Sequence, residues 1–240
     1  MEFSFEYSTN IVEIVVDIFS WALIIYFIYY FYQKLERKPK VWKAVVATFV
    51  GLFTFSFNFT MLGALVEIPI LPLGVWVLYW YAHSRNGAWD KYRSFAWLGF
   101  VANFLFIVTA ILSVFLHHLV FPKDDPSIYI SNAENAGLLK THPSGEEVVL
   151  DKENVSQALS SYHEEQVESI DWYTDITFQV EPHEREEKFP YHLIGTKPKW
   201  GSGLSTMIYI ERDGKGILVD SSEKQRYFRT TESLLKGGSE

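Results

Sequence analysis

Polar and ionisable side chains interrupt several long apolar segments in the first half of this chain. They are Glu13, Asp17, Asn58, Glu67, Asn103, His117 and His118. Hydrocarbon makes such groups costly unless a partner satisfies them, and an ionisable residue inside an apolar span is a functional hypothesis by default. One interpretation is a proton or cation site with Glu13 and Asp17 as acceptors, His117 as their partner and Glu67 at its mouth.

The other interpretation of this intramembrane polar cluster is structural. Asp17 and Asn58 would join helices by hydrogen bonds, while Glu13, Glu67 and the two histidines contact lipid headgroups. At ~1.5 Å per helical residue, Asp17 lies about 9 Å inside its span and is the only deep acid. The structural interpretation is favoured because proton-moving transporters carry more polar groups near the middle of the membrane.

Four apolar segments must position these residues. The stretches that predict membrane-spanning helices are 11–32, 41–66, 68–83 and 94–121. The third is short, but Pro69 and Pro72 allow a tight hairpin with the second. The sequence therefore predicts an all-α four-helix transmembrane bundle over residues 1–121.

Small residues recur at helical spacing in the second and fourth segments. They include Ala44, Ala47 and Gly51 in one and Ala96 and Gly99 in the other. Stripes of small side chains allow helices to approach closely, so the face of the fourth segment from Gly99 to His117 is expected to pack against both the first and the second segments.

Basic residues predict the orientation. All eight Lys and Arg of residues 1–121 fall between Lys34 and Lys43 or between Arg85 and Arg93. The positive-inside rule places both loops in the cytoplasm, so both termini are expected to be extracytoplasmic in a multi-pass plasma-membrane protein. The N-terminus lacks the basic region of a cleaved signal peptide, so the first segment is expected to remain in the mature protein.

Residues 122–240 form a separate acidic region, with 13 basic and 22 acidic residues and a net charge of −9. They are predicted to be a small soluble α+β domain outside the cytoplasm, with a helix between Val155 and Val167. Strands are expected at 128–131, 137–141 and 227–231, and a loop at 183–203. A hairpin turning at Asp213 and Gly214 would pair Ile208 with Val219 and Ile210 with Ile217. The same register places Arg212 opposite Lys215, and the repulsion between these like charges leaves a longer turn open.

Catalytic and metal-binding patterns are missing from the sequence. The chain has no cysteine, which excludes thiol chemistry and thiolate-bound zinc. His163 and Glu164 begin an H-E-x-x-H pattern that ends in Val167 rather than histidine. No catalytic residue, metal or cofactor is predicted. Lys197, Lys199 and Trp200 could contact a partner protein or lipid headgroups, although an ordinary loop explains them equally well.

These observations favour a non-enzymatic integral membrane protein that is an accessory, regulatory or sensor component of a membrane complex. Its expected partners are the lipid bilayer and another membrane protein or a second copy of the chain. Nucleic acid is not expected, because the acidic region repels phosphate. The alternative is a small transporter or proton-coupled channel subunit using Asp17, Asn58 and Glu67. A weaker third interpretation is a membrane enzyme using His117 and His118.

Overall fold

The computed structural model describes residues 9–61, 64–85, 87–152, 155, 158–168, 172–174, 185–221 and 224–237, with the backbone alone at 59–61 and 64–66. This part of the chain divides into two compact units. The first unit runs from Val12 to Leu116, and the second joins the chain up to Ile11 to the chain from His117 onward.

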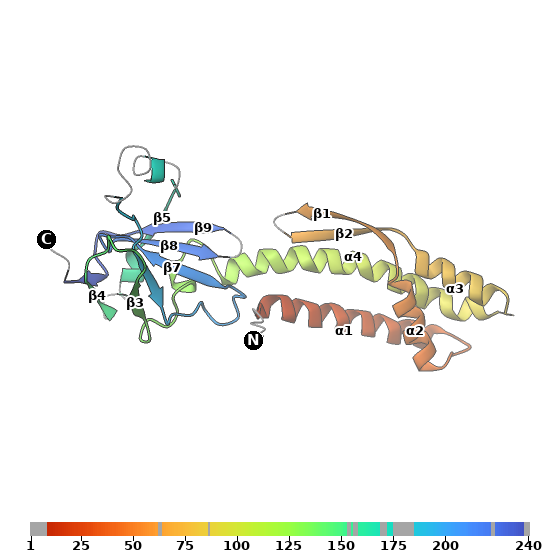
Figure 1. Cartoon of the computed structure of the whole chain (residues 1–240). Coiled ribbons are helices and arrows are strands. Elements are labelled where there is room, and N and C mark those ends of the chain that lie inside the picture. The colour runs from red at the N-terminus through yellow and green to blue at the C-terminus, as the bar shows by residue number, and fades with distance from the viewer. Residues whose placement is uncertain are drawn as a thin grey trace, which may run out of the picture. The chain divides into compact units, whose positions relative to one another are not determined.

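The first unit combines α-helices with a β-hairpin (Figure 1). Its elements in the described residues are α1 (Ile11–Lys34), α2 (Val41–Gly51), β1 (Phe55–Met61), β2 (Ala64–Leu71), α3 (Leu73–His83) and α4 (Ala88–Val120). Helices α1 and α4, with 24 and 33 residues, are long and apolar enough to cross a membrane. They include most of the first and fourth predicted spans.

The predicted four-helix transmembrane bundle is wrong. Helix α2 ends at Gly51, and residues 55–61 and 64–66 of the predicted span 41–66 lie in the antiparallel hairpin of β1 and β2. Residues 55–61 alternate between apolar and polar side chains, which is the period of a strand rather than a helix. Helices α2 and α3 have 11 residues each, about 16 Å at the helical rise, so neither the span 41–66 nor the span 68–83 forms.

Small residues bring α2 close to α3 and α4, as the sequence predicted for α2 and α4. A Cβ atom on Gly99 of α4 would lie 2.0 Å from the backbone oxygen of Thr48. A Cβ atom on Gly74 of α3 would lie 1.7 Å from the backbone oxygen of Val50. Ala44 and Phe95 are fully buried beside these contacts. Only glycine therefore fits where these helix backbones meet.

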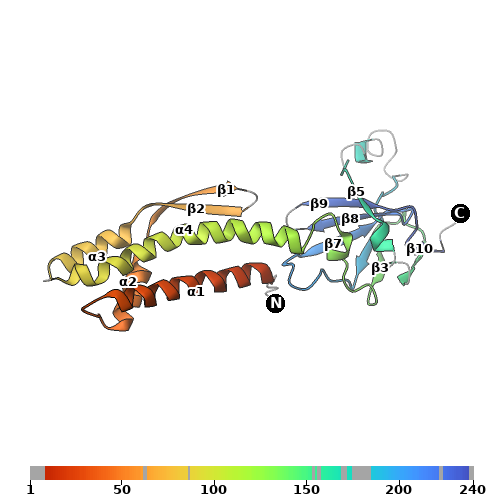
Figure 2. The same ribbon diagram turned by 180° about the vertical axis from the view of Figure 1, so that it is seen from behind.

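The second unit is built on a six-stranded antiparallel sheet with strand order β3-β6-β7-β8-β9-β5 (Figure 2). Its strands are β3 (Gly137–Lys140), β5 (His163–Glu165), β6 (Tyr191–Ile194), β7 (Thr206–Ile210), β8 (Gly216–Ser221) and β9 (Gln225–Arg229). The described part of this unit also contains a two-stranded ladder and two 3-10 helices, namely β4 (Val149–Leu150) with β10 (Leu235–Lys236), η1 (Pro126–Ile128) and η2 (Leu159–Ser161). The core beneath the sheet includes Tyr129, Ile210, Ile217 and Phe228.

The predicted hairpin register is confirmed, since Ile208 pairs with Val219 and Ile210 with Ile217. Its turn is the longer alternative, because β7 ends at Ile210 and β8 begins at Gly216. The predicted strands at 137–141 and 227–231 correspond to β3 and β9.

The predicted helix at 155–167 is confirmed only at its start, because Val155 and Ala158 are helical but η2 and β5 follow from Leu159 onward. The predicted strand at 128–131 overlaps η1 and forms no strand, and the predicted loop at 183–203 contains β6. These errors share a cause. The 3-10 helices and strands involved have three or four residues each, which is too few to show a period.

Candidate functional site

A polar recess of about 380 Å³ opens on the second unit. Its lining combines charges of both signs with aromatic rings. The lining residues are Glu165, Gln166, Glu168, Trp172, Lys188, Glu211, Tyr227 and Arg229. Three of them are acidic and two are basic, so the described lining carries a net negative charge.

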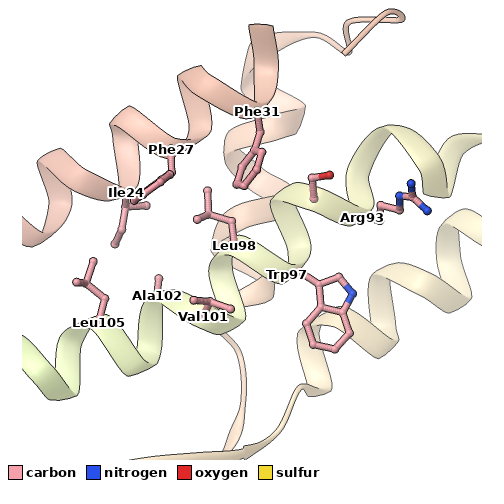
Figure 3. Close-up of a pocket in the computed structure, with 10 residues that line it drawn as sticks. Ile24, Phe27, Phe31, Arg93, Trp97, Leu98, Val101, Ala102 and Leu105 are labelled. Carbon is pink, nitrogen blue, oxygen red and sulfur yellow. The ribbon is translucent and has the colours of Figure 1, made fainter. Parts of the chain in front are cut away.

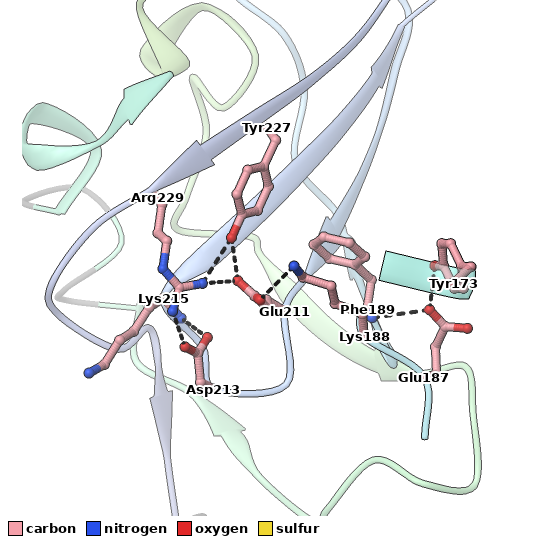
Figure 4. A network of polar contacts seen from close by, with 9 residues as sticks. All are labelled: Tyr173, Glu187, Lys188, Phe189, Glu211, Asp213, Lys215, Tyr227 and Arg229. Atoms are coloured by element: carbon pink, nitrogen blue, oxygen red, sulfur yellow. Dashed lines mark hydrogen bonds and ion pairs between the residues drawn. The ribbon is translucent and has the colours of Figure 1, made fainter. Parts of the chain in front are cut away.

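Glu211 is the centre of the polar network in this recess (Figure 4). It follows the last residue of β7, and its side chain is only 11% exposed. Its Oε2 accepts a hydrogen bond from the Tyr227 hydroxyl at 2.6 Å and another from Arg229. Its Oε1 lies 3.5 Å from the Lys188 ammonium. Glu211 therefore compensates two cations that come from different segments of the chain.

The network requires a glycine at the start of β8. A Cβ atom on Gly216 would lie 2.0 Å from Glu211 Oε2 and 2.7 Å from the Tyr227 hydroxyl. Any larger residue at position 216 would displace the Glu211 carboxylate from Tyr227 and Arg229.

Asp213 extends the network into the β7–β8 turn. Its Oδ2 accepts a hydrogen bond from Arg229 Nη2 at 2.6 Å, and its Oδ1 accepts one from the Lys215 backbone at 2.9 Å. Arg229 Nη1 also donates to the Tyr227 hydroxyl at 2.8 Å. The Arg229 guanidinium is thus held between two carboxylates, which fixes the turn relative to β9.

Three aromatic rings surround the Lys188 ammonium. Its Nζ lies 4.0 Å from the ring centroid of Trp172, 5.6 Å from that of Tyr227 and 5.9 Å from that of Phe189. The rings also contact one another, with centroids 5.1 to 5.9 Å apart. Such rings attract cations through their negative faces. The recess thus already accommodates one ammonium group.

Burial raises the pKa of Tyr227, and its hydrogen bond to Glu211 raises it further. The hydrogen bond to Tyr227 is the largest cause of the raised pKa of Arg229, and the nearby carboxylates of Glu211 and Asp213 add to it. Both side chains therefore remain protonated at neutral pH. A general acid or base works best with a pKa near the working pH, so neither group suits proton transfer.

The described lining contains no serine, threonine, cysteine or histidine that could be a nucleophile with a base beside it. No group of three potential metal ligands occurs within the described residues. The arrangement is therefore suited to binding a cation through carboxylates and aromatic faces. The hydrogen-bond network keeps the central carboxylate, Glu211, in position.

The residues of the predicted intramembrane cluster make separate contacts. Asn58 and Glu67 are cross-strand partners in the hairpin, and both are exposed. The Asn103 amide donates to the backbone oxygen of Leu52, at the end of α2, at 3.3 Å. Glu13 and Asp17 lie on exposed positions of α1. Asn103 thus satisfies a helix carbonyl that has lost its own partner, which is a structural role.

His117 and His118 lie in the last turn of α4. His117 is buried, and its Nε2 lies 2.8 Å from the backbone oxygen of Ser202, whereas His118 is exposed. Lys197, Lys199 and Trp200, the predicted partner-binding residues, are all exposed in the segment that leads to this contact.

An apolar groove of about 540 Å³ runs between α1 and α4 within the first unit (Figure 3). Phe27 and Phe31 of α1 and Leu98 and Val101 of α4 contribute to its walls, and Arg93 lies at one end. A second apolar groove, of about 560 Å³, lies between α1 and α2. Grooves of this kind on apolar helices suit lipid chains or the apolar helix of a partner.

Sequence reasoning missed the recess. Its residues come from separate stretches around 165–172, at 188 and 211, and at 227–229. Glu211 and Arg229 appear as ordinary charged residues beside a turn, and no local spacing joins them to Lys188. The one local signal was Gly216, a glycine just inside a strand, which often marks a close approach.

Comparison of the chain with protein families, with curated proteins and with solved structures finds no match. Its function must therefore be argued from the geometry described above.

Proposed function

We propose that this chain is a non-enzymatic integral membrane protein, an accessory or sensor component of a membrane complex, and that its sheet unit is the binding module. The observation that carries this proposal is the recess around Glu211, together with the two apolar helices in the same chain. Glu211 forms ion pairs with Lys188 and Arg229, and groups paired in this way suit recognition better than turnover.

The chemistry of the recess favours a cationic ligand. Glu165 and Glu168 make the net charge of the lining negative, because its other charged residues are one acid, Glu211, and two bases, Lys188 and Arg229. The region 122–240 has a net charge of −9, which attracts cations from a distance. The ammonium of Lys188 between three aromatic rings illustrates the kind of group that fits. A basic side chain presented by a partner protein meets all three conditions.

The carboxylate of Asp17 supports a partner within the membrane. Asp17 is exposed on α1 and makes no hydrogen bond or ion pair within the described part of the chain. A carboxylate facing hydrocarbon is costly unless another group covers it. A polar or basic side chain from another membrane protein, or from a second copy of the chain, would stabilise it.

The basic loops support an orientation with both termini outside the cytoplasm. If α1 and α4 are the two spans, the loops at 34–43 and 85–93 lie on one side and both termini on the other. The positive-inside rule assigns the basic side to the cytoplasm of a plasma-membrane protein. The transporter alternative remains a prediction, since no contact among the described residues favours it.

Co-purification from mild detergent tests the proposal. We expect the protein to stay with membranes through an alkaline wash and to carry a stoichiometric membrane protein with it. The double variant Glu165→Gln with Glu168→Gln should weaken this association, because both side chains are exposed and their loss leaves the fold intact. Glu147→Gln, an exposed glutamate outside the recess, is the matched control. Release of the protein by the alkaline wash would contradict the proposal. So would a partner that co-purifies equally well with the wild type and with the double variant.

A further inference from the structure

The segment from Lys197 to Gly203 presents an exposed tryptophan between two glycines and two lysines. Trp200 is 77% exposed, and Lys197 and Lys199 are exposed beside it. These cations stand out in a region of the chain with a net charge of −9. A large exposed indole is unusual on a soluble surface and is typical of a contact surface.

This loop is bound to the ends of both apolar helices. The Ile11 amide, at the start of α1, donates to the backbone oxygen of Gly201 at 3.0 Å. His117 Nε2, in the last turn of α4, lies 2.8 Å from the backbone oxygen of Ser202. A β-bridge between Asn10 and Ser202 joins the same segments. The loop therefore contacts the first residue of α1 and the last turn of α4.

The glycines make this attachment possible. Gly201 has a φ of +82°, and a Cβ atom there would lie 2.9 Å from Ile11 Cγ2. Gly203 has a φ of +68°, and its Cβ atom would lie 3.0 Å from that of Asn10. On the other side of the loop the Lys199 amide donates to the backbone oxygen of Ile128 at 2.7 Å. Trp200 is thus exposed on a loop whose backbone is fixed on both sides.

We propose that Lys197, Lys199 and Trp200 form an interfacial anchor that docks on the anionic phospholipid headgroups of the membrane crossed by α1 and α4. Tryptophan concentrates at the boundary between hydrocarbon and water, where its ring is buried and its N–H stays hydrated. Each lysine near an anionic surface favours the docked state about five-fold. The inference rests on the proposed function in one respect, namely that the two helices span a membrane.

Because the chain has no cysteine, a single cysteine can be introduced and labelled at a chosen position without first removing native cysteines. In the full-length protein, Trp200→Cys is labelled with a fluorescent nitrobenzoxadiazole probe. The aromatic probe then takes the place of the indole ring. Val149→Cys, 70% exposed in the sheet unit, is the control for water, and Val108→Cys, 62% exposed on α4, is the control for lipid. The proteins are reconstituted into phosphatidylcholine vesicles with and without phosphatidylglycerol.

We expect the probe at position 200 to be quenched by lipids with a nitroxide near the headgroup, more strongly in vesicles that contain phosphatidylglycerol. The probe at position 149 should remain unquenched. Charge reversal at Lys197 and Lys199 to glutamate should remove the dependence on anionic lipid, while Lys224→Glu, an exposed lysine outside the loop, should not.

Three outcomes would overturn the anchor. The first is a probe at 200 in water while the probe at 108 is in lipid, and this result leaves the proposed function intact. The second is quenching at position 200 that changes neither with the anionic lipid content nor with charge reversal at the two lysines. The third is shielding at 200 only when a co-purified protein is added, which would assign the loop to a protein partner. A probe at 108 in water would instead contradict the proposed membrane protein itself.

Discussion

Replacing Glu211 tests whether the recess is held by one buried carboxylate. In Glu211→Ala the Tyr227 hydroxyl loses its acceptor at 2.6 Å, and Lys188 loses the carboxylate 3.5 Å from its ammonium. Arg229 keeps Asp213 at 2.6 Å. Glu211→Gln retains the shape and an acceptor for Tyr227 but removes the negative charge. The two variants therefore separate the effect of charge from that of packing.

The expected magnitudes follow from burial. Removing one partner of a fully buried ion pair costs about 3–5 kcal/mol. The side chains of Arg229 and Lys188 are 33% and 24% exposed, so water compensates part of the loss. We expect Glu211→Ala to lower the free energy of unfolding by about 2–3 kcal/mol and Glu211→Gln by about 1 kcal/mol. For a domain of this size these losses lower Tm by roughly 10 °C and roughly 4 °C.

Thermal unfolding of the full-length protein in mild detergent, followed by near-ultraviolet circular dichroism, measures both values. Glu147→Ala is the control, because this glutamate is 94% exposed and pairs with Lys140 at 3.3 Å on the surface. Its Tm should change by less than about 2 °C. A Glu211→Ala protein that unfolds at the wild-type temperature would refute the assignment of Glu211 as the centre of the network.

Three further outcomes are expected. Gly99→Ala should disrupt the packing of α4 on α2 and lower stability in detergent by about 1–3 kcal/mol, because its Cβ atom would meet the Thr48 oxygen at 2.0 Å; Gly137→Ala, which meets only the Ile194 side chain at 3.3 Å, should have little effect. Tyr162→Phe should leave Tm unchanged or raised, since the buried Tyr162 hydroxyl has no hydrogen-bond partner in the described structure, and a clear fall in Tm would argue against this. Burial raises the pKa of both Tyr162 and Tyr227, so the folded state holds these protons more tightly than the unfolded state; stability should be fully present below the ordinary tyrosine pKa of about 10 and fall as the pH rises above it, and a Tm series between about pH 8 and 11 that stays flat would contradict this.

Helices α1 and α4 could be predicted because length and apolar composition are local properties. The second span could not be predicted by the same rule, since apolar content does not distinguish a helix from a strand. The deciding signal was the alternation from Phe55 to Met61, which a count of apolar residues averages away. Close packing between α2 and α4 was predictable from glycines and alanines, because small residues have few other reasons to recur at helical spacing.

In the sheet unit, the register of β7 and β8 was predictable because the turn and the alternation of side chains act together over a few residues. The recess was not, because Trp172, Lys188, Glu211 and Arg229 meet only after the strands have paired. Of the residues singled out from the sequence, His117 and Trp200 lie in or beside one structural feature, the loop bound to the helix ends. His117 contacts the backbone oxygen of Ser202, two residues after Trp200. A contact with a backbone atom does not depend on the residue type, so the sequence could not predict it.

The most direct test of the account is the accessibility of two single cysteines in intact cells. Lys38→Cys lies in the exposed basic loop after α1, and Val149→Cys lies on the exposed surface of the sheet unit. The account predicts that a membrane-impermeant thiol reagent labels position 149 in intact cells and labels position 38 only after the membrane is permeabilised. Labelling of position 38 in intact cells, with protection of position 149, would contradict the placement of the sheet unit outside the cytoplasm.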